Sequence, residues 1–273
     1  MKSKPSDMIL RGVMWLSTAC TFGALFFVVG HVLVKGLPHI RPSLFALTYN
    51  TQNVSLLPAL ITTLYTIALA LGIAVPLGIF TAIYLVEYAK RGSRLVRLVR
   101  MTAETLSGIP SIVYGLFGLL FFVTWLGWGF SLLAGAFTLA TMILPLIMRT
   151  AEESLKATPD MYREGAFGLG AGRLRTVFRI VLPAAAPGIL AGVILAVGRI
   201  VGETAALIYT AGTVAQVPSS LFASGRTLAV HMYALSSEGL YTGQAYATAV
   251  ILLVVVTGIN ALSAALAKKI AKG

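Results

Sequence analysis

Long apolar runs separated by short polar segments dominate the sequence. A membrane-spanning helix needs about 20 predominantly apolar residues. Six runs reach that length and are numbered here as spans one to six: residues 13–34, 59–86, 106–125, 130–148, 186–211 and 244–266. Pro76 and Pro145 fall inside spans two and four, where they predict kinks that neighbouring helices can tolerate. The pattern predicts an all-α integral membrane protein, a six-helix bundle built by a single domain over residues 1–273.

The composition fits a protein whose solvent is largely lipid. Hydrophobic residues make up 58% of the chain and charged residues 11%, whereas soluble domains carry about 25% charged residues. The single cysteine, Cys20, excludes an intramolecular disulfide. The apolar run around Cys20 continues to Val34, which favours a retained first span over a cleaved signal peptide.

Positive charges are distributed unevenly between the segments that connect the spans. The segments 2–11, 90–100, 149–179 and 268–272 hold 17 of the 21 Lys and Arg residues. The alternate connections hold only Lys35, Arg41 and Arg226, and Arg199 lies inside span five. Because basic loops remain in the cytoplasm, both termini are expected to be cytoplasmic. The net charge of +12 is therefore a topology signal rather than a sign of nucleic-acid binding.

The segment 150–183 is the largest predicted cytoplasmic piece. The sequence predicts two short helices around a turn that contains Gly168, Gly170 and Gly172, with Pro183 ending the second helix before span five. The sequence argues against a nucleotide-binding glycine loop, because no strand is predicted before the glycines and no Lys-Ser or Lys-Thr pair follows them. Two interpretations remain, a basic loop held by anionic lipid and a docking element for a partner.

The spacing within this segment resembles the EAA signature of ABC importer permeases, which runs Glu-Ala-Ala, three residues, Gly, nine residues, Ile, one residue and Leu-Pro. The corresponding residues here are Glu164, Gly165, Ala166, Gly170, Ile180, Leu182 and Pro183. Only Gly165 departs from the signature, and it keeps a small residue where the family usually has alanine. The resemblance implies a bundle of the type I ABC importer permease kind, whose loop inserts into a groove of a separate ATPase.

Three longer segments, residues 102–118, 149–207 and 218–239, resemble the PstA-type permeases of phosphate importers. The resemblance implies inorganic phosphate as the substrate and the bacterial cytoplasmic (inner) membrane as the location. It also implies a second, PstC-like permease, two PstB-like ATPase subunits and an extracytoplasmic phosphate-binding protein as partners. Because the chain has no Walker A motif, it is expected to be non-catalytic and to bind no cofactor, leaving ATP and Mg²⁺ to the ATPase.

Arg199 and Glu203 are two charges inside span five. Each charge near the bilayer midplane costs about 2.5–3.5 kcal/mol, so this part of the span should face protein or a wet cavity rather than lipid. The i, i+4 spacing would place both side chains on one helical face, close enough to pair. One interpretation is a structural ion pair. The other is a translocation pathway in which Arg199 binds an anion and Glu203 partly neutralises it, so that the anion can leave.

Three hydroxyl-bearing residues are further candidates for the anion route, namely Ser107, Ser111 and Thr204. The motif around Pro110 favours a helix cap with proline in its first turn, and the alternative is a broken helix that exposes backbone N–H groups to the anion. His31, His39 and His231 lack metal-ligand spacing, so no metal site is predicted.

Three other functions compete with phosphate import. The chain could be the permease of an importer for another oxyanion, such as molybdate or sulfate. It could be an ion-coupled secondary carrier that works alone, although such a carrier has no use for the segment 150–183. A purely structural or signalling membrane subunit is the third alternative, and it would tolerate the loss of Arg199.

Overall fold

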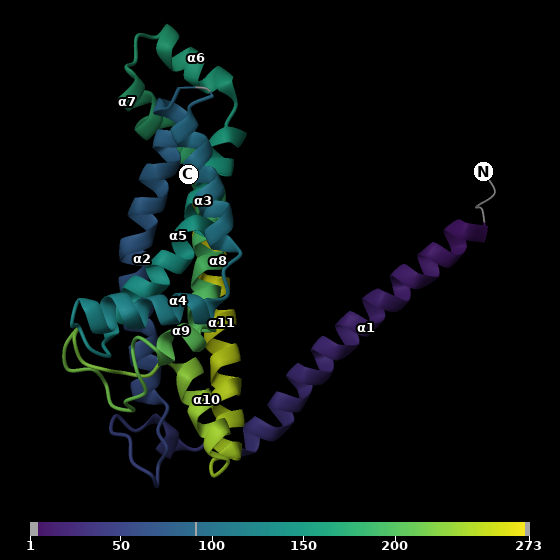
Figure 1. The fold of residues 1–273 in the computed structure, drawn as a ribbon. Coiled ribbons are helices and arrows are strands. Elements are labelled where there is room, and N and C mark those ends of the chain that lie inside the picture. The colour runs from purple at the N-terminus through teal and green to yellow at the C-terminus, as the bar shows by residue number, and fades with distance from the viewer. Residues whose placement is uncertain (1–4, 91, 271–273) are drawn as a thin grey trace.

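The computed structural model describes residues 5–90 and 92–270, and every regular element among them is helical (Figure 1). Lys2, Lys4, Arg91 and Lys272 of the predicted basic segments lie outside the described residues. Five helical stretches in the described chain are long and apolar enough to cross a membrane, or six if one bent pair counts as a span. They are built on α1 (Pro5–Gly36), α2 (Leu57–Ile83), α5 (Leu132–Ala157), α8 (Leu182–Val201) and α11 (Thr242–Ile270).

Span three is not the straight helix that its hydropathy predicts. Helix α3 (Arg94–Ser107) ends before Gly108, and α4 (Ser111–Gly118) continues through the π-helical η4 (Leu119–Trp125). The two parts are bent by 103°. Pro110 disfavours a helical conformation at the residue before it and donates no backbone hydrogen bond, which explains the interruption.

Span five differs from the prediction at both of its ends. Helix α8 stops at Val201, and only a short helix, α9 (Ala205–Ile208), follows. Upstream, Pro183 does not end a helix, because a helical path runs from Arg173 to Val201. It comprises α7 (Arg173–Thr176), the π-helical η5 (Val177–Val181) and α8. The change of hydrogen-bond register at η5 gives Pro183 a first-turn position, where a missing N–H costs little.

Small residues allow the central helices to approach closely. Helix α5 packs against both α2 and α8. Gly188 and Gly192 of α8 face Ser154 and Thr150 of α5, and a Cβ atom at Gly192 would lie 2.0 Å from the Thr150 hydroxyl oxygen. This four-residue spacing of glycines is the small-residue packing motif of membrane helices.

The two ends of the bundle carry different connections. Helix α6 (Asp160–Gly168) and α7 lie at one end, and α10 (Leu228–Glu238) lies at the other, with the short helices η1 (Leu37–His39) and η2 (Pro42–Phe45). A π-helical turn, η3 (Tyr84–Tyr88), extends α2 at the α6 end. Helix α11 runs from the α10 end towards the α6 end, whereas α1 runs in the opposite direction and ends beside η1 (Figure 1).

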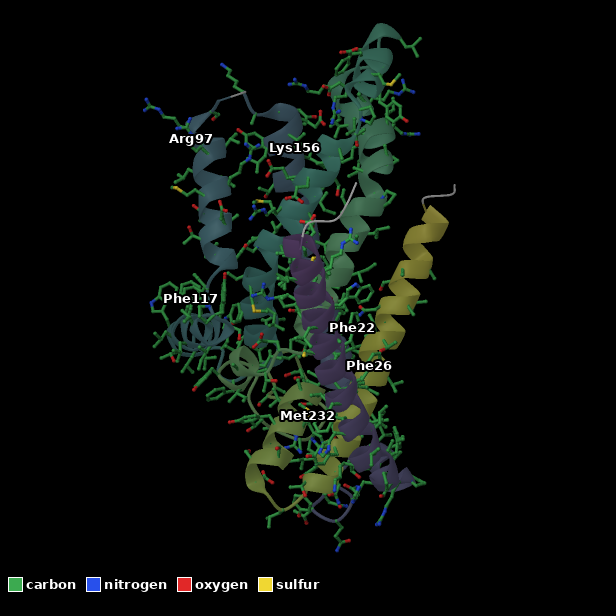
Figure 2. All side chains as sticks on the ribbon, turned by 90° about the vertical axis from the view of Figure 1, so that its right-hand side faces the viewer. Phe22, Phe26, Arg97, Phe117, Lys156 and Met232 are labelled. Atoms are coloured by element: carbon green, nitrogen blue, oxygen red, sulfur yellow. The ribbon has the colours of Figure 1, made fainter. Side chains whose placement is uncertain are left out.

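Helix α1 diverges from the rest of the bundle (Figure 1). It meets α11 and η1 near its C-terminal end, and its most apolar window contains no buried residue. Phe22 and Phe26 are among the aromatic side chains that it exposes (Figure 2). A helix of this length and apolarity is left for lipid or another protein chain to cover.

Candidate functional site

Two interrupted helices meet in the middle of the bundle. The break at residues 108–110 precedes α4, the break at residues 202–204 precedes α9, and α4 packs against α9. Gly115 makes this contact close, because a Cβ atom there would lie 2.8 Å from the Cα atom of Ala206. Interrupted helices inside a membrane protein are tolerated where they are buried in protein or line a cavity. The arrangement therefore marks this region as the candidate pathway.

Arg199 occupies the last turn of α8 and is partly exposed. Within the described chain it has no ion pair within 4.0 Å, so the expected Arg199–Glu203 pair is not formed. The reason is that the helix ends at Val201, and the i, i+4 relationship no longer holds beyond that residue. Glu203 instead lies in the break, 8% exposed, where its Oε1 accepts a hydrogen bond of 3.0 Å from the Ala206 amide. The carboxylate therefore caps α9.

The three predicted hydroxyl residues have different surroundings. Thr204 lines a cavity of about 630 Å³ between α4, α9, α10 and α11, beside Ile112 of α4. Ser111 is the first residue of α4, directly after Pro110, so the proline precedes the helix rather than occupying its first turn. The hydroxyl of Ser107 donates to the Ala103 carbonyl at 2.8 Å, within α3.

The surroundings of Arg199 are suited to an anion. The hydroxyl of Tyr114, in α4, donates to the Leu106 carbonyl at 2.8 Å and holds α4 to the last turn of α3. A guanidinium that no carboxylate of the described chain neutralises can bind the oxygens of a passing oxyanion. The arrangement thus combines one available cation with two broken helices.

In the predicted loop 150–183, α6 is a short helix followed by a glycine-containing turn, as expected, whereas α7 is not a separate short helix but begins the helical path to Val201. Gly170 adopts φ = +81°, a left-handed conformation that favours glycine. Glu164 and Gly165 are exposed and Ala166 is 5% exposed, so α6 rests on the bundle through one face. Leu169, directly after α6, is 91% exposed.

A buried ion pair that the sequence did not reveal connects this loop to the bundle. Arg163 of α6 contacts Glu87 of η3 at 2.7 Å, with side-chain exposures of 14% and 9%. The guanidinium also donates to the carbonyls of Leu155 and Thr158 at 2.9 and 2.8 Å. The signal for this pair in the sequence is Glu87, a single acidic residue in the turn that leads into a basic segment.

A second unforeseen cluster lies at the α10 end. Arg226 is 6% exposed and its guanidinium carbon lies 4.7 Å from the ring centre of Tyr49. The same ring meets His231 edge-on at 6.1 Å. Burial, and then the charge of Arg226, lower the pKa of His231 to about 3. The histidine is therefore neutral at physiological pH. Over the described residues, no group of three His, Cys, Asp or Glu side chains gathers as a metal site would.

The chain is similar to known membrane proteins. The family described as "Binding-protein-dependent transport system inner membrane component" matches residues 74–272. "Probable ABC transporter permease protein YqgI" of Bacillus subtilis is 30% identical over 88% of this chain and 86% of its own length. "Phosphate transport system permease protein PstA 1" of Mycobacterium tuberculosis is 36% identical over 78% of this chain and 70% of its own length.

A solved structure has a similar fold. A chain in the crystal structure of a bacterial alginate ABC transporter, in complex with an alginate pentasaccharide-bound periplasmic protein, matches with a TM-score of 0.72. The match covers 97% of this chain and 96% of that chain at 16% sequence identity. At this identity the likeness concerns the fold alone.

Proposed function

The chain belongs to the family of inner membrane components of binding-protein-dependent transport systems, and we propose that it is the permease subunit of an ATP-driven importer of inorganic phosphate. The observation that carries the substrate class is Arg199, a guanidinium without a carboxylate partner in the described chain, placed where two broken helices meet. The name of the Mycobacterium tuberculosis relative supports phosphate among the oxyanions.

The anion would pass Arg199 by weak and transient binding. The planar guanidinium offers paired donors to two oxygens of a phosphate ion, and a site that held the ion too tightly would trap it. Glu203 is not bound to Arg199, so its carboxylate adds negative potential nearby without blocking the donors. The exit of the anion then depends on the movement of the broken helices around it.

The movement would come from a separate ATPase. In this proposal two PstB-like subunits bind ATP and Mg²⁺, close on each other, and push on α6 through its exposed face. Arg163 and Glu87 would transmit the displacement to α2. A PstC-like permease would complete the pathway and cover α1, whose apolar window is unburied in this chain. An extracytoplasmic phosphate-binding protein would supply the anion at the α10 end, and both termini would lie in the cytoplasm.

Transport by the reconstituted complex tests the proposal. The permease pair and the ATPase are placed in liposomes that contain the binding protein and labelled phosphate, and ATP is added outside. The lumen then corresponds to the extracytoplasmic side, so import is measured as labelled phosphate that appears in the medium. We expect ATP-dependent phosphate movement, and weaker or no movement of sulfate and molybdate. If the complex transports sulfate or molybdate better than phosphate, that anion is the substrate. Transport by this chain without any ATPase would instead identify a secondary carrier.

A further inference from the structure

A basic cavity of about 580 Å³ lies at the α6 end of the bundle, between α3, the end of α5 and the loop formed by α6 and α7. Five cationic side chains from five different segments line it: Lys90, Arg100, Lys156, Arg163 and Arg173. The lining includes two carboxylates, Glu87 and Asp160. Positively charged side chains from parts of the chain that are far apart in sequence therefore line the same cavity.

Carboxylates neutralise only part of this charge. Arg163 binds both Glu87 and Asp160, at 2.7 and 3.1 Å. Arg100 and Lys156 share one further carboxylate, that of Glu152, at 2.6 Å each. Three carboxylates thus accompany five cations. This leaves an excess of two positive charges, which would attract a ligand that carries negative charge on several oxygens.

Two of the cations are available for a ligand. Among the described residues neither Lys90 nor Arg173 has an ion pair within 4.0 Å. Lys90 is exposed, and Arg173 lies over the ring of Tyr88 with 5.4 Å between the guanidinium carbon and the ring centre. A ligand in the cavity would meet these two side chains without breaking an existing ion pair.

The helix beside the cavity has the character of a membrane-surface helix. Val96 and Ala103 of α3 are buried against the bundle. Leu95, Leu98 and Met101 point away from it, with exposures of 52%, 56% and 58%. Exposed apolar residues next to basic residues are typical of helices at the boundary between headgroups and acyl chains. The cavity would therefore open at headgroup depth.

We propose that this cavity is a binding site for a phosphate group, presented either by an anionic phospholipid headgroup or by free phosphate from the same side of the membrane. The inference rests on the proposed orientation, in which the α6 end is cytoplasmic. Basic pockets between helices on that side bind anionic headgroups. Because Arg163 and Arg173 belong to α6 and α7, an occupied site would hold α3 together with the loop formed by α6 and α7, called here the coupling loop because it is proposed to dock the ATPase.

Two double variants of equal charge test the site. Lys90→Gln/Arg173→Gln removes the two cations of the cavity that have no ion pair among the described residues. Arg94→Gln/Arg97→Gln removes two exposed cations of α3 that do not line it. Figure 2 places Lys156 between α3 and the coupling loop and Arg97 on the outer edge of α3. Thermal unfolding is measured first, and Lys90→Gln alone replaces the cavity variant if the double variant does not fold.

The complex is taken from membranes of phosphatidylglycerol and phosphatidylcholine, and the retained lipids are counted by native mass spectrometry. In a second arm, inorganic phosphate is titrated into delipidated complex. We expect the cavity variant to lose affinity by about 25-fold, since each basic residue near an anionic surface contributes about fivefold. The α3 control should retain the wild-type affinity.

Selective loss of phosphatidylglycerol supports a lipid headgroup as the ligand, and selective loss of phosphate binding supports the soluble anion. Equal behaviour of the two double variants in both arms overturns the proposal. Neither arm requires transport or ATP hydrolysis, so this failure is distinct from a failure of the proposed import function.

Discussion

Arg163 in α6 and Glu87 in η3 form an ion pair of 2.7 Å although 76 positions separate them in the sequence. The carboxylate belongs to the end of span two, and the guanidinium belongs to the loop expected to dock the ATPase. The same guanidinium donates to two carbonyls, one in the last turns of α5 and one directly after it. One side chain therefore joins α6 to two of the long helices.

Breaking this pair should uncouple ATP hydrolysis from transport. Arg163→Ala leaves Glu87 buried without a partner, and breaking a buried pair costs about 3–5 kcal/mol. Arg163→Lys keeps the charge but cannot replace the forked donors, so we expect an intermediate defect. The measurements are phosphate moved per ATP hydrolysed and hydrogen exchange of α6. Glu104→Gln is the control, because Glu104 is 73% exposed and 4.0 Å from Arg149. Wild-type coupling in Arg163→Ala would show that the pair does not transmit movement.

The sequence predicts the membrane class better than it predicts the course of the spans. The fold class, a helical bundle of type I importer permeases, is confirmed by the family and by the structural match. Hydropathy counts apolar residues, so it continued span three across Pro110 and span five across Gly202. The interruptions arise from backbone hydrogen bonding, which hydropathy does not register.

In the candidate site, too, a local feature was easier to predict than contacts that depend on the course of the helices and on tertiary structure. The EAA spacing is local, and its glycine turn appears in the structure with Gly170 in a left-handed conformation. The Arg199–Glu203 pair was inferred from helical spacing, and it failed because α8 ends between the two residues. The Arg163–Glu87 pair depends on tertiary structure, and no periodicity in the sequence connects residues so far apart.

Adding a methyl group at Gly192 should separate α5 from α8. A Cβ atom there would lie 2.0 Å from Oγ1 and 2.6 Å from Cβ of Thr150. Overpacking of this kind costs about 1–3 kcal/mol, so Gly192→Ala should lower the Tm of the purified complex. Gly72→Ala is the matched control, since nothing lies within 4 Å of a Cβ atom at Gly72. Equal Tm values for the two variants would contradict close packing at Gly192.

Alanine at Gly165 should be tolerated and should stabilise α6. No atom lies within 4 Å of a Cβ atom at this position. Replacing glycine with alanine inside a helix contributes about 0.5–1 kcal/mol. Gly170→Ala provides the contrast, because its φ of +81° is strained for alanine. Hydrogen exchange of α6 should slow in the first variant and accelerate in the second. The idea fails if Gly165→Ala accelerates exchange.

Acid should destabilise the protein through His231. Its pKa is about 3 in the folded state, against about 6.5 in an unfolded chain. Between these values the unfolded chain binds a proton that the folded chain excludes, because burial and Arg226 oppose a second charge beside Tyr49. Above pH 6.5 the titration of His231 does not change the free energy of unfolding. As the pH falls from 6.5 towards 3, the free energy of unfolding decreases by about 1.4 kcal/mol per pH unit.

His231→Gln removes this titrating group, so the comparison is made with that variant. The Tm difference between wild type and variant, measured from pH 7.5 to pH 4.5, should change steadily in favour of the variant below pH 6.5. A difference that is constant with pH would show that His231 titrates normally in the folded protein.

Arg199→Ala should abolish phosphate uptake while the complex still assembles. The guanidinium has no ion pair in the described chain, so its removal leaves no carboxylate unpaired and should not unfold the bundle. Arg199→Lys keeps the charge without the planar fork and should retain partial uptake. Glu203→Gln keeps an oxygen that accepts from the Ala206 amide, so it should assemble normally and report the effect of the charge alone.

Labelled-phosphate uptake and co-purification with the ATPase are measured for all three. Loss of assembly in Arg199→Ala would assign the residue a structural role, and normal uptake would remove it from the pathway.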